Sequence, residues 1–168
     1  KQELRTDEQL WVQEIFYTVQ GEGPLAGRPA VFIRLSGCNL TCRFCDTEFE
    51  SGQMATTAFV VEAALKAVPT TFRGDPLFVL TGGEPFRQDI RPLVAELLRL
   101  GDVQIETAGT LWLEGIDPAS TLIVSPKTGK LHAAVLARAK YLKYIIRAGE
   151  TSPGDGLPSV NPQTGALQ

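Results

Sequence analysis

The sequence predicts an α/β domain in which parallel strands alternate with helices. Short apolar runs bounded by Gly or Pro alternate with segments whose apolar residues recur at helical spacing. Such β-α-β units are right-handed and form a parallel sheet. Strand after strand also ends in glycines or polar residues, as expected where loops at the C-terminal edge of a parallel sheet or barrel build a site. We therefore expect the chemistry to lie at that edge.

The N-terminal half predicts two strands and a helix. Residues 11–18 and 30–35 are rich in β-branched and aromatic side chains, and the glycines of residues 20–24 require a turn between them. The second strand is expected to be buried and to lead directly into the cysteines. After Thr56, apolar residues recur at helical spacing until Pro69 stops the pattern.

The C-terminal half continues the alternation. Residues 77–80 form a compact apolar run that predicts a strand, and Asp89 then resembles the cap of a helix that Gly101 closes. Three more short strands are expected at residues 103–105, 122–124 and 141–146, with a helix at residues 131–139 between the last two.

Composition limits the class of protein. The chain of 168 residues is 43% hydrophobic and 21% charged, which describes one soluble domain with a core and excludes disordered and collagen-like structure. The net charge of −3 provides no basic field for a polyanion, so nucleic acid is not expected as a direct partner. Residues 1–10 lack the apolar core of a signal peptide, and no run is long enough for a membrane helix. We expect a cytoplasmic protein that acts on a small molecule.

The chain shows no internal repeat, so residues 1–168 are expected to form a single domain. The tail, residues 152–165, is rich in Pro, Gly, Ser and Asn and resembles an interrupted loop. The first residue is Lys1 rather than Met. These features suggest that a C-terminal segment is missing from this sequence.

The three cysteines of the chain, Cys38, Cys42 and Cys45, lie within eight residues. Their C-x3-C-x2-C spacing can turn three thiolates onto one metal centre, one fewer than the four that close an iron–sulfur or structural zinc site. An odd, clustered set favours metal binding over a disulfide framework. The alternatives are a zinc site completed by His132 and a redox C-x2-C pair. His132 lacks ligand spacing and is expected to be a surface helix residue.

The cysteine spacing after a buried strand resembles the signature of radical S-adenosylmethionine (SAM) enzymes. The resemblance implies a partial, incomplete TIM-like barrel of parallel strands. It also implies that the three cysteines hold a 4Fe-4S cluster, whose fourth iron SAM chelates, and that Phe44 lies near the adenine. The other cofactor-binding residues that it implies are Cys45, Asp46, Gly83, Glu84, Glu106, Ser125, Pro126 and Lys127.

The glycines of Thr81-Gly82-Gly83-Glu84-Pro85 resemble the family's second motif. Glycines let backbone carbonyls approach a ligand that a Cβ would block, and a carboxylate such as that of Glu84 can accept from an ammonium. Taken alone, a glycine turn after a strand is often only structural. Glu106-Thr107 and Ser125-Pro126-Lys127 fit contacts to the ribose and methionine, but such polar residues are also common at strand ends.

Residues 11–150 resemble one subfamily, 7-carboxy-7-deazaguanine synthase, a lyase of queuosine and 7-deazapurine biosynthesis. The matching motifs are Gln20-Gly21-Glu22-Gly23, Gly27-Arg28-Pro29, Arg34, Cys45-Asp46-Thr47, Thr81-Gly82-Gly83-Glu84-Pro85, Glu106-Thr107 and Ser125-Pro126-Lys127. The resemblance implies ring contraction of 6-carboxy-5,6,7,8-tetrahydropterin to 7-carboxy-7-deazaguanine with loss of ammonia. It assigns substrate contacts to Val19, Gln20, Gly21, Glu22, Arg34 and Thr81, and a Mg2+ ligand to Thr47.

The chemistry of these residues agrees with the roles. A pterin edge offers donors that suit the carboxylate of Glu22, and the guanidinium of Arg34 can bind a carboxylate bidentately. Mg2+ prefers oxygen ligands and retains waters, so one hydroxyl from Thr47 with substrate oxygens is sufficient. The alternative for Arg34 is a solvated or salt-bridged strand residue, which its apolar surroundings disfavour because an unpaired buried charge is costly.

The sequence departs from the subfamily at two places. Ala108 stands where the family has asparagine after Glu-Thr, and nothing after Gly149 matches the family's last strand and substrate-contacting segment. The resemblance also implies a homodimer and an electron donor such as flavodoxin or ferredoxin, with no residue assigned as general acid or base. Two alternative hypotheses remain. One is a radical SAM activase that generates a glycyl radical on a partner protein, and the other is a zinc-dependent binding module.

Overall fold

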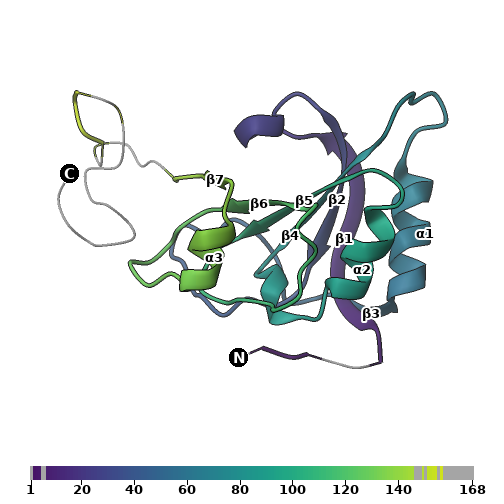
Figure 1. Cartoon of the computed structure of the whole chain (residues 1–168), viewed down its shortest axis with the longest axis horizontal. Coiled ribbons are helices and arrows are strands. Elements are labelled where there is room, and N and C mark those ends of the chain that lie inside the picture. Colours follow the sequence, from purple (N-terminus) through teal and green to yellow (C-terminus); the bar gives the residue numbers. More distant parts are fainter. Residues whose placement is uncertain (1, 5–6, 146–148, 150, 155, 157–168) are drawn as a thin grey trace.

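The computed structural model describes residues 2–4, 7–145, 149, 151–154 and 156. They form a seven-stranded sheet in the order β3-β1-β2-β4-β5-β6-β7 (Figure 1). The strands are β1 (Gln9–Val19), β2 (Pro29–Leu35), β3 (Gln53–Thr56), β4 (Leu77–Gly82), β5 (Asp102–Thr107), β6 (Thr121–Val124) and β7 (Tyr141–Leu142). The helices are α1 (Thr57–Ala67), α2 (Arg91–Leu97) and α3 (Ala133–Arg138), with 3-10 turns η1 (Gly23–Leu25) and η2 (Pro85–Arg87).

Five strands, β2, β4, β5, β6 and β7, run parallel to one another. The described sheet has β3 at one edge and β7 at the other, so it does not close into a full barrel. This confirms the α/β class and the incomplete barrel expected from the sequence.

The expectation of an all-parallel sheet is wrong for its first strand. β1 pairs antiparallel with β2 and with β3. The link between β1 and β2, residues 20–28, holds only the short turn η1, whereas a parallel connection needs a crossover of a dozen or more residues. The strand β3 was not expected, because its sequence Gln-Met-Ala-Thr lacks a β-branched or aromatic run.

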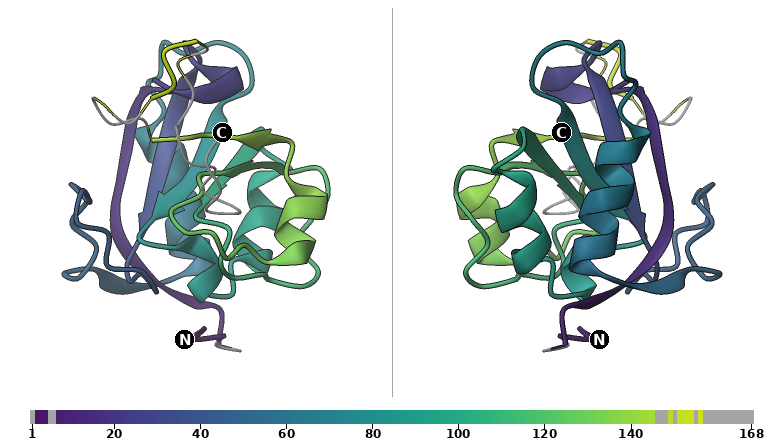
Figure 2. Two further views of the ribbon diagram at one scale, coloured as in Figure 1. Left: turned by 90° about the vertical axis from the view of Figure 1, so that its left-hand side faces the viewer. Right: turned by 90° about the vertical axis from the view of Figure 1, so that its right-hand side faces the viewer.

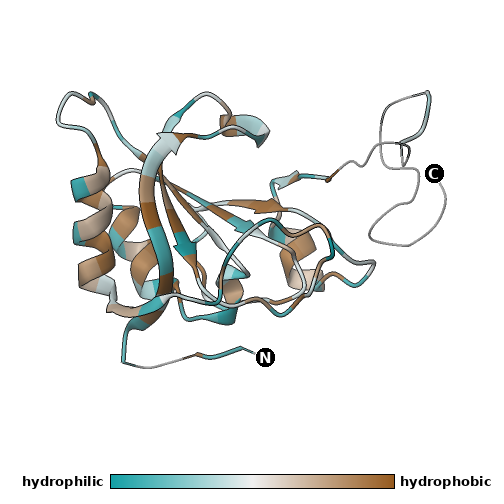
Figure 3. Cartoon of the chain, turned by 180° about the vertical axis from the view of Figure 1, so that it is seen from behind, coloured by the Kyte–Doolittle hydropathy of each residue, from teal (hydrophilic) through white to brown (hydrophobic). Residues whose placement is uncertain are grey.

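The two faces of the sheet have different partners because side chains alternate along each strand. On one face, Ile33, Leu80 and Ile105 belong to the main core with the apolar stripes of all three helices. On the other face, Ala30, Leu77 and Val79 form a small cluster beneath Leu25 of η1 and Phe32. Figure 3 shows apolar residues along the central strands and on the helices. The second face is therefore only partly covered, and it carries the site.

The helices begin close to where the sequence predicts. Thr56 caps α1, and its Oγ1 accepts from the backbone N–H of Phe59 at 3.2 Å. Asp89 accepts from the N–H of Arg91 at 3.2 Å, but Ile90 occupies the cap position and α2 ends at Leu97, before Gly101. A Cβ at Gly101 would lie 2.2 Å from the backbone oxygen of Pro76. Close approach to the chain before β4, and not a left-handed helix cap, therefore requires that glycine.

The last elements are shorter than expected. α3 spans Ala133–Arg138, and β7 contains only Tyr141 and Leu142. Ile146, at the end of the strand expected at 141–146, lies outside the described residues, as does most of the loop expected at 152–165. Among the described helices, none is long and apolar enough to cross a membrane.

Candidate active site

A cavity of about 680 Å3 opens at the C-terminal ends of the parallel strands. Arg34 of β2, Thr81 of β4 and Glu106 of β5 contribute to its wall, together with Ser125 directly after β6. The cysteine-bearing segment after β2 forms another wall, and Figure 2 shows residues 40–52 on the opposite side of the sheet from α2 and α3. The cavity thus lies at the edge where the sequence placed the chemistry.

Most of the residues singled out from the sequence line this cavity. They are Glu22, Arg34, Cys38, Cys42, Phe44, Cys45, Asp46, Thr47, Thr81, Gly83, Glu106, Ser125 and Lys127. Five other residues that the sequence singled out do not line the cavity: Val19, Gln20, Gly21, Glu84 and Pro126. The sequence did not point to several lining residues, among them Phe32, Leu40, Phe49, Lys143, Tyr144 and Ile145.

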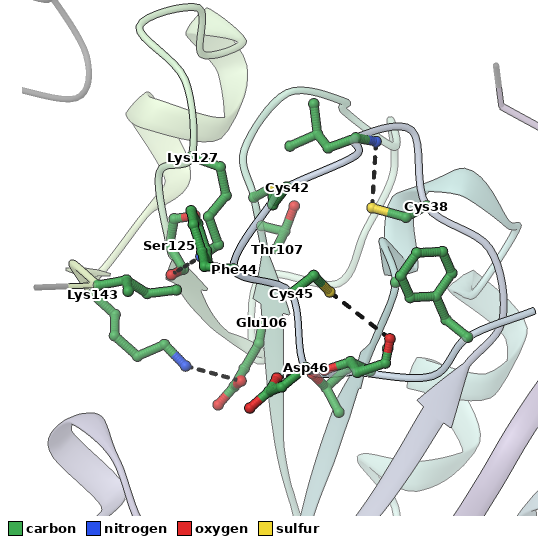
Figure 4. A pocket seen from close by; sticks show the side chains of 18 of the residues that line it. Cys38, Cys42, Phe44, Cys45, Asp46, Glu106, Thr107, Ser125, Lys127 and Lys143 are labelled. Atoms are coloured by element: carbon green, nitrogen blue, oxygen red, sulfur yellow. Dashed lines mark hydrogen bonds and ion pairs between the residues drawn. The ribbon is translucent and has the colours of Figure 1, made fainter. Parts of the chain in front are cut away.

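The three cysteines are free thiols in one loop (Figure 4). Cys38 Sγ accepts from the N–H of Leu40 at 3.4 Å, and Cys45 Sγ contacts the backbone oxygen of Thr47 at 3.8 Å. Burial raises the pKa of the Cys38 thiol. Within the described part of the chain, no three His, Cys, Asp or Glu side chains converge closely enough to hold a metal ion. The donor set fits an iron–sulfur cluster by chemistry, and binding requires the thiols to turn toward one another.

Glu84 does not line the cavity, although its motif predicted a contact with the cofactor. Its side chain is fully buried, and its carboxylate accepts from Thr107 Oγ1 at 2.7 Å, from Phe86 N at 3.0 Å and from Ala108 N at 2.8 Å. Burial raises the pKa of this carboxyl, although the three donors act in the opposite direction. Glu84 therefore ties η2 to the end of β5 beneath the cavity.

Arg34 lines the cavity and is also salt-bridged. Its Nε donates to Glu14 Oε1 at 2.6 Å, and its guanidinium lies 5.9 Å from the ring centroid of Phe16. The sequence argument against a salt-bridged arginine is thus corrected: the antiparallel strand β1 brings Glu14 opposite Arg34 in the register. This pairing fixes the guanidinium through Nε, and the described residues provide no hydrogen-bond partner for its two Nη groups.

Lys143 is a site residue that the sequence reading missed. Its Nζ lies 2.7 Å from Glu22 Oε2 and 3.2 Å from Glu106 Oε2. Burial alone would lower the pKa of Lys143, but the carboxylates of Glu106 and Glu22 outweigh it and raise the pKa. A signal was present, because Lys143 interrupts the apolar run at 141–146 in the way that Arg34 interrupts the run at 30–35.

Comparisons with known proteins identify the family of this chain. No protein-family model matches it. The 7-carboxy-7-deazaguanine synthase of Rhodospirillum rubrum is 48% identical over 93% of this chain and 66% of its own length. The same-named protein of Bacteroides thetaiotaomicron is 44% identical over 88% of this chain and 76% of its own length. The chain belongs to the 7-carboxy-7-deazaguanine synthase family.

A solved structure agrees with this assignment. QueE from Escherichia coli matches with a TM-score of 0.72 and 29% identity over 83% of this chain and 73% of that chain. The chain spans 66% of the Rhodospirillum synthase and 62% of the Rickettsia prowazekii synthase, to which it is 41% identical over 82% of its own length.

Two further residues named in the sequence analysis, Ala108 and His132, lie within the described part of the chain. The main-chain N–H of Ala108 donates to Glu84, a contact that needs no particular side chain at this position. His132 is exposed and caps α3, its Nδ1 accepting from Ala134 N at 3.2 Å. Its placement as a surface residue at a helix end is therefore confirmed, and it belongs to no described metal site.

Gly83 allows the cysteine loop to lie against the end of β4. A Cβ there would lie 2.2 Å from the backbone oxygen of Gly37 and 2.9 Å from the backbone nitrogen of Cys38. We expect Gly83→Ala to lower the free energy of unfolding by about 1–3 kcal/mol, as overpacking does. It should also reduce the iron bound after anaerobic reconstitution, because the loop must move. Urea unfolding and iron analysis measure the two effects.

Gly154→Ala is the control, since the nearest atom of the described residues to its added Cβ is Ser152 Oγ at 3.9 Å. It should change stability by less than about 0.5 kcal/mol. Wild-type stability and iron content in Gly83→Ala would contradict the close approach as a constraint on the loop.

Proposed function

We propose that this chain forms the catalytic part of a radical SAM lyase that converts 6-carboxy-5,6,7,8-tetrahydropterin to 7-carboxy-7-deazaguanine and ammonia. One observation carries the proposal. The three free cysteines, Arg34 and Glu22 line the same cavity of about 680 Å3, a size suited to a cofactor and a small substrate. The relatives carry the synthase name, which favours this activity over a glycyl-radical activase.

The cofactor side of the cavity consists of the cysteine loop and the ends of β4 and β6. Cys38, Cys42 and Cys45 would hold a 4Fe-4S cluster, which with SAM supplies a 5'-deoxyadenosyl radical able to take hydrogen from C6 of the pterin. Phe44 lines the cavity, and 38% of its surface is exposed. The remaining cofactor contacts that line the cavity would be made by Asp46, Gly83, Glu106, Ser125 and Lys127.

Lys127 is held in place near the proposed ribose and methionine contacts. Its Nζ donates to the backbone oxygen of Ser125 at 3.0 Å and also contacts Ser125 Oγ. Burial lowers the pKa of Lys127, and the neighbouring ammonium of Lys143 lowers it further. Lys127 therefore offers a positioned donor for polar groups of the cofactor.

The substrate side consists of β2 and the turn after β1. The Nη groups of Arg34 would bind the pterin carboxylate, while Glu14 holds Nε. Glu22 would accept from the amino edge of the pterin, and Thr81 lies beside Arg34 in the register of β2 and β4. The overall conversion only removes ammonia and is redox-neutral, so the chain's task is to place the reacting carbon beside the radical.

A Mg2+ ion, an electron donor and a second subunit complete the proposal. Thr47 Oγ1 lies in the cavity wall, 3.3 Å from Asp46 Oδ1, and would supply a hydroxyl ligand alongside substrate oxygens. A flavodoxin or ferredoxin would deliver the single electron. By family resemblance we expect a homodimer. No residue is required as general acid or base.

Product formation tests the proposal. The anaerobically reconstituted protein, supplied with SAM, dithionite, Mg2+ and the carboxytetrahydropterin, should release 7-carboxy-7-deazaguanine and ammonia in equal amounts. Chromatography with mass detection measures the product. Cleavage of SAM without any deazaguanine would overturn the substrate assignment and favour the activase.

The Arg34→Gln variant tests the substrate side separately. We expect KM for the carboxypterin to rise about tenfold to a hundredfold, because a charge-assisted bidentate contact is lost, while SAM cleavage without substrate stays close to that of the wild type. Arg73→Gln is the control, since the hydrogen bonds of the Arg73 guanidinium with described residues go to the backbone of its own loop. An unchanged KM in Arg34→Gln would remove Arg34 from the substrate site.

A further inference from the structure

We propose that Lys143 is a positioning residue that holds the carboxylates of Glu22 and Glu106 in the wall of the cavity. The proposal deepens, and rests on, the function proposed above. The ammonium joins Glu22 in the turn after β1 to Glu106 of β5, at 2.7 Å and 3.2 Å. The backbone of Lys143 is itself fixed, because its N–H donates to the backbone oxygen of Val124 at 2.7 Å.

Glu22 depends on this lysine for the direction of its carboxylate. Its side chain is 66% exposed, at the tip of the turn between β1 and β2. Gln20 Oε1 accepts from the main-chain N–H of Glu22 at 3.0 Å, which places the backbone. For the carboxylate, however, Lys143 is the one hydrogen-bonding partner that the described residues provide. Without the lysine, this carboxylate would be free to turn into solvent.

Glu106 forms an ion pair with the same lysine. Its side chain is only 15% exposed, and Oε1 accepts from Gln20 Nε2 at 3.0 Å and from Gln104 Nε2 at 2.8 Å. These amides satisfy hydrogen bonds but carry no charge. Among the described residues, Lys143 is the cation that forms a salt bridge with this largely buried carboxylate, a group that is costly to leave unpaired.

The contacts close into a ring. Gln20 bonds to both Glu22 and Glu106, and Lys143 bonds to the same two residues. Gln20 is almost fully buried, with 2% of its surface exposed, so it supports the ring from behind. Figure 4 shows Lys143 reaching toward Glu106 across the cavity wall. The ring ties the exposed turn of the β1–β2 hairpin to the middle of the sheet.

A second cation among the described residues, Lys127, attracts both carboxylates but forms no hydrogen bond with either of them. Lys127 lies close by, but its ammonium is bonded to Ser125. The raised pKa of Lys143 keeps its ammonium charged at neutral pH. Loss of Lys143 should therefore release Glu22 and weaken pterin recognition, while the cysteine side of the cavity is preserved.

Equilibrium binding of 6-carboxypterin, the oxidised and unreactive pterin, tests this without turnover. Titration against SAM-loaded, reconstituted protein is followed by pterin fluorescence. We expect Lys143→Met and Lys143→Gln to raise Kd about tenfold or more. Loss of a residue that supports the ligands of a metal site weakens affinity by a similar factor. Lys143→Arg should restore Kd to within about threefold, because it keeps the charge. The iron content of the reconstituted protein should stay unchanged, because Lys143 forms no hydrogen bond or ion pair with the cysteine loop among the described residues.

The control is Lys140→Met, an exposed lysine just before β7, which should leave Kd unchanged. The double variant Glu22→Gln with Lys143→Met isolates the mechanism, since Lys143 should add little once Glu22 cannot form the ion pair. Additive effects would show that Lys143 acts on the ligand independently, and an unchanged Kd in Lys143→Met would show that it has no role. Either result overturns the proposal. Failure of wild-type protein to bind the pterin would instead overturn the proposed function, and this inference with it.

Discussion

Cys42→Ala is expected to abolish iron binding and SAM cleavage while the fold stays intact. The Cys42 thiol lines the cavity and makes no hydrogen bond among the residues that the structure describes, so its removal takes little from stability, less than about 1 kcal/mol. Cys42 is proposed to bind the cluster directly. Its loss should therefore reduce activity by more than the roughly tenfold to hundredfold that loss of an outer-sphere residue causes. Iron analysis, the visible absorbance of the reconstituted protein and SAM cleavage measure the loss.

Thr41→Ala is the matched control, because Thr41 is the exposed neighbour in the same loop. It should bind iron like the wild type. A Cys42→Ala protein that retained a full iron complement would rule out the three-cysteine cluster. Stoichiometric zinc in place of iron in the wild type would support the alternative interpretation, a zinc-dependent binding module.

Glu84→Ala is expected to destabilise the fold more than any other single change discussed. It removes a fully buried carboxylate and leaves three donors, Thr107 Oγ1, Phe86 N and Ala108 N, without their acceptor. Each buried unsatisfied group costs about 1–3 kcal/mol, so the total loss should reach at least about 3 kcal/mol. Urea denaturation measures it. Glu96→Ala on the exposed face of α2 is the control and should change stability by less than about 0.5 kcal/mol.

The same residue predicts a dependence of stability on pH. Burial raises the pKa of Glu84 in the folded protein, so the folded state binds this proton more tightly than the unfolded state does. The resulting stabilisation is fully present below the ordinary carboxyl pKa of the unfolded chain and is lost as the pH rises through the raised folded value. The stability difference between wild type and Glu84→Gln should therefore shrink as the pH rises. A difference that grew with pH would mean that the three donors outweigh burial.

Residues that directly follow an apolar run could be placed at the site from the sequence, whereas the direction of a buried side chain could not. The cysteine loop, Thr81 and Ser125 follow apolar runs directly, and parallel strands bring their C-terminal ends to one edge, so local pattern was enough. Glu84 follows the same rule in sequence, yet its side chain turns into the core. The expectation that residues at strand ends build the site predicts where their backbone lies, but it does not predict the direction of their side chains.

The antiparallel β1 accounts for most of what sequence reading missed. An apolar run does not reveal its direction, and only the short link of residues 20–28 argues against a crossover. This strand brings Glu14 and Phe16 to Arg34 and carries Glu22 over the open face of the sheet. The partners of Arg34 and Glu22 therefore depended on pairing between strands that the local pattern does not specify.

By itself, the sequence determined the α/β class, the order of most elements, the clustered thiols and the edge at which polar residues gather. These follow from periodicity, glycine and proline positions and cysteine spacing, all of which act over a few residues. Only the tertiary structure decided that Glu84 is buried, that Arg34 is held by Glu14, and that Lys143 reaches Glu22. These contacts join residues far apart in the chain, and they depend on strand register and side-chain direction, which the folded packing alone selects.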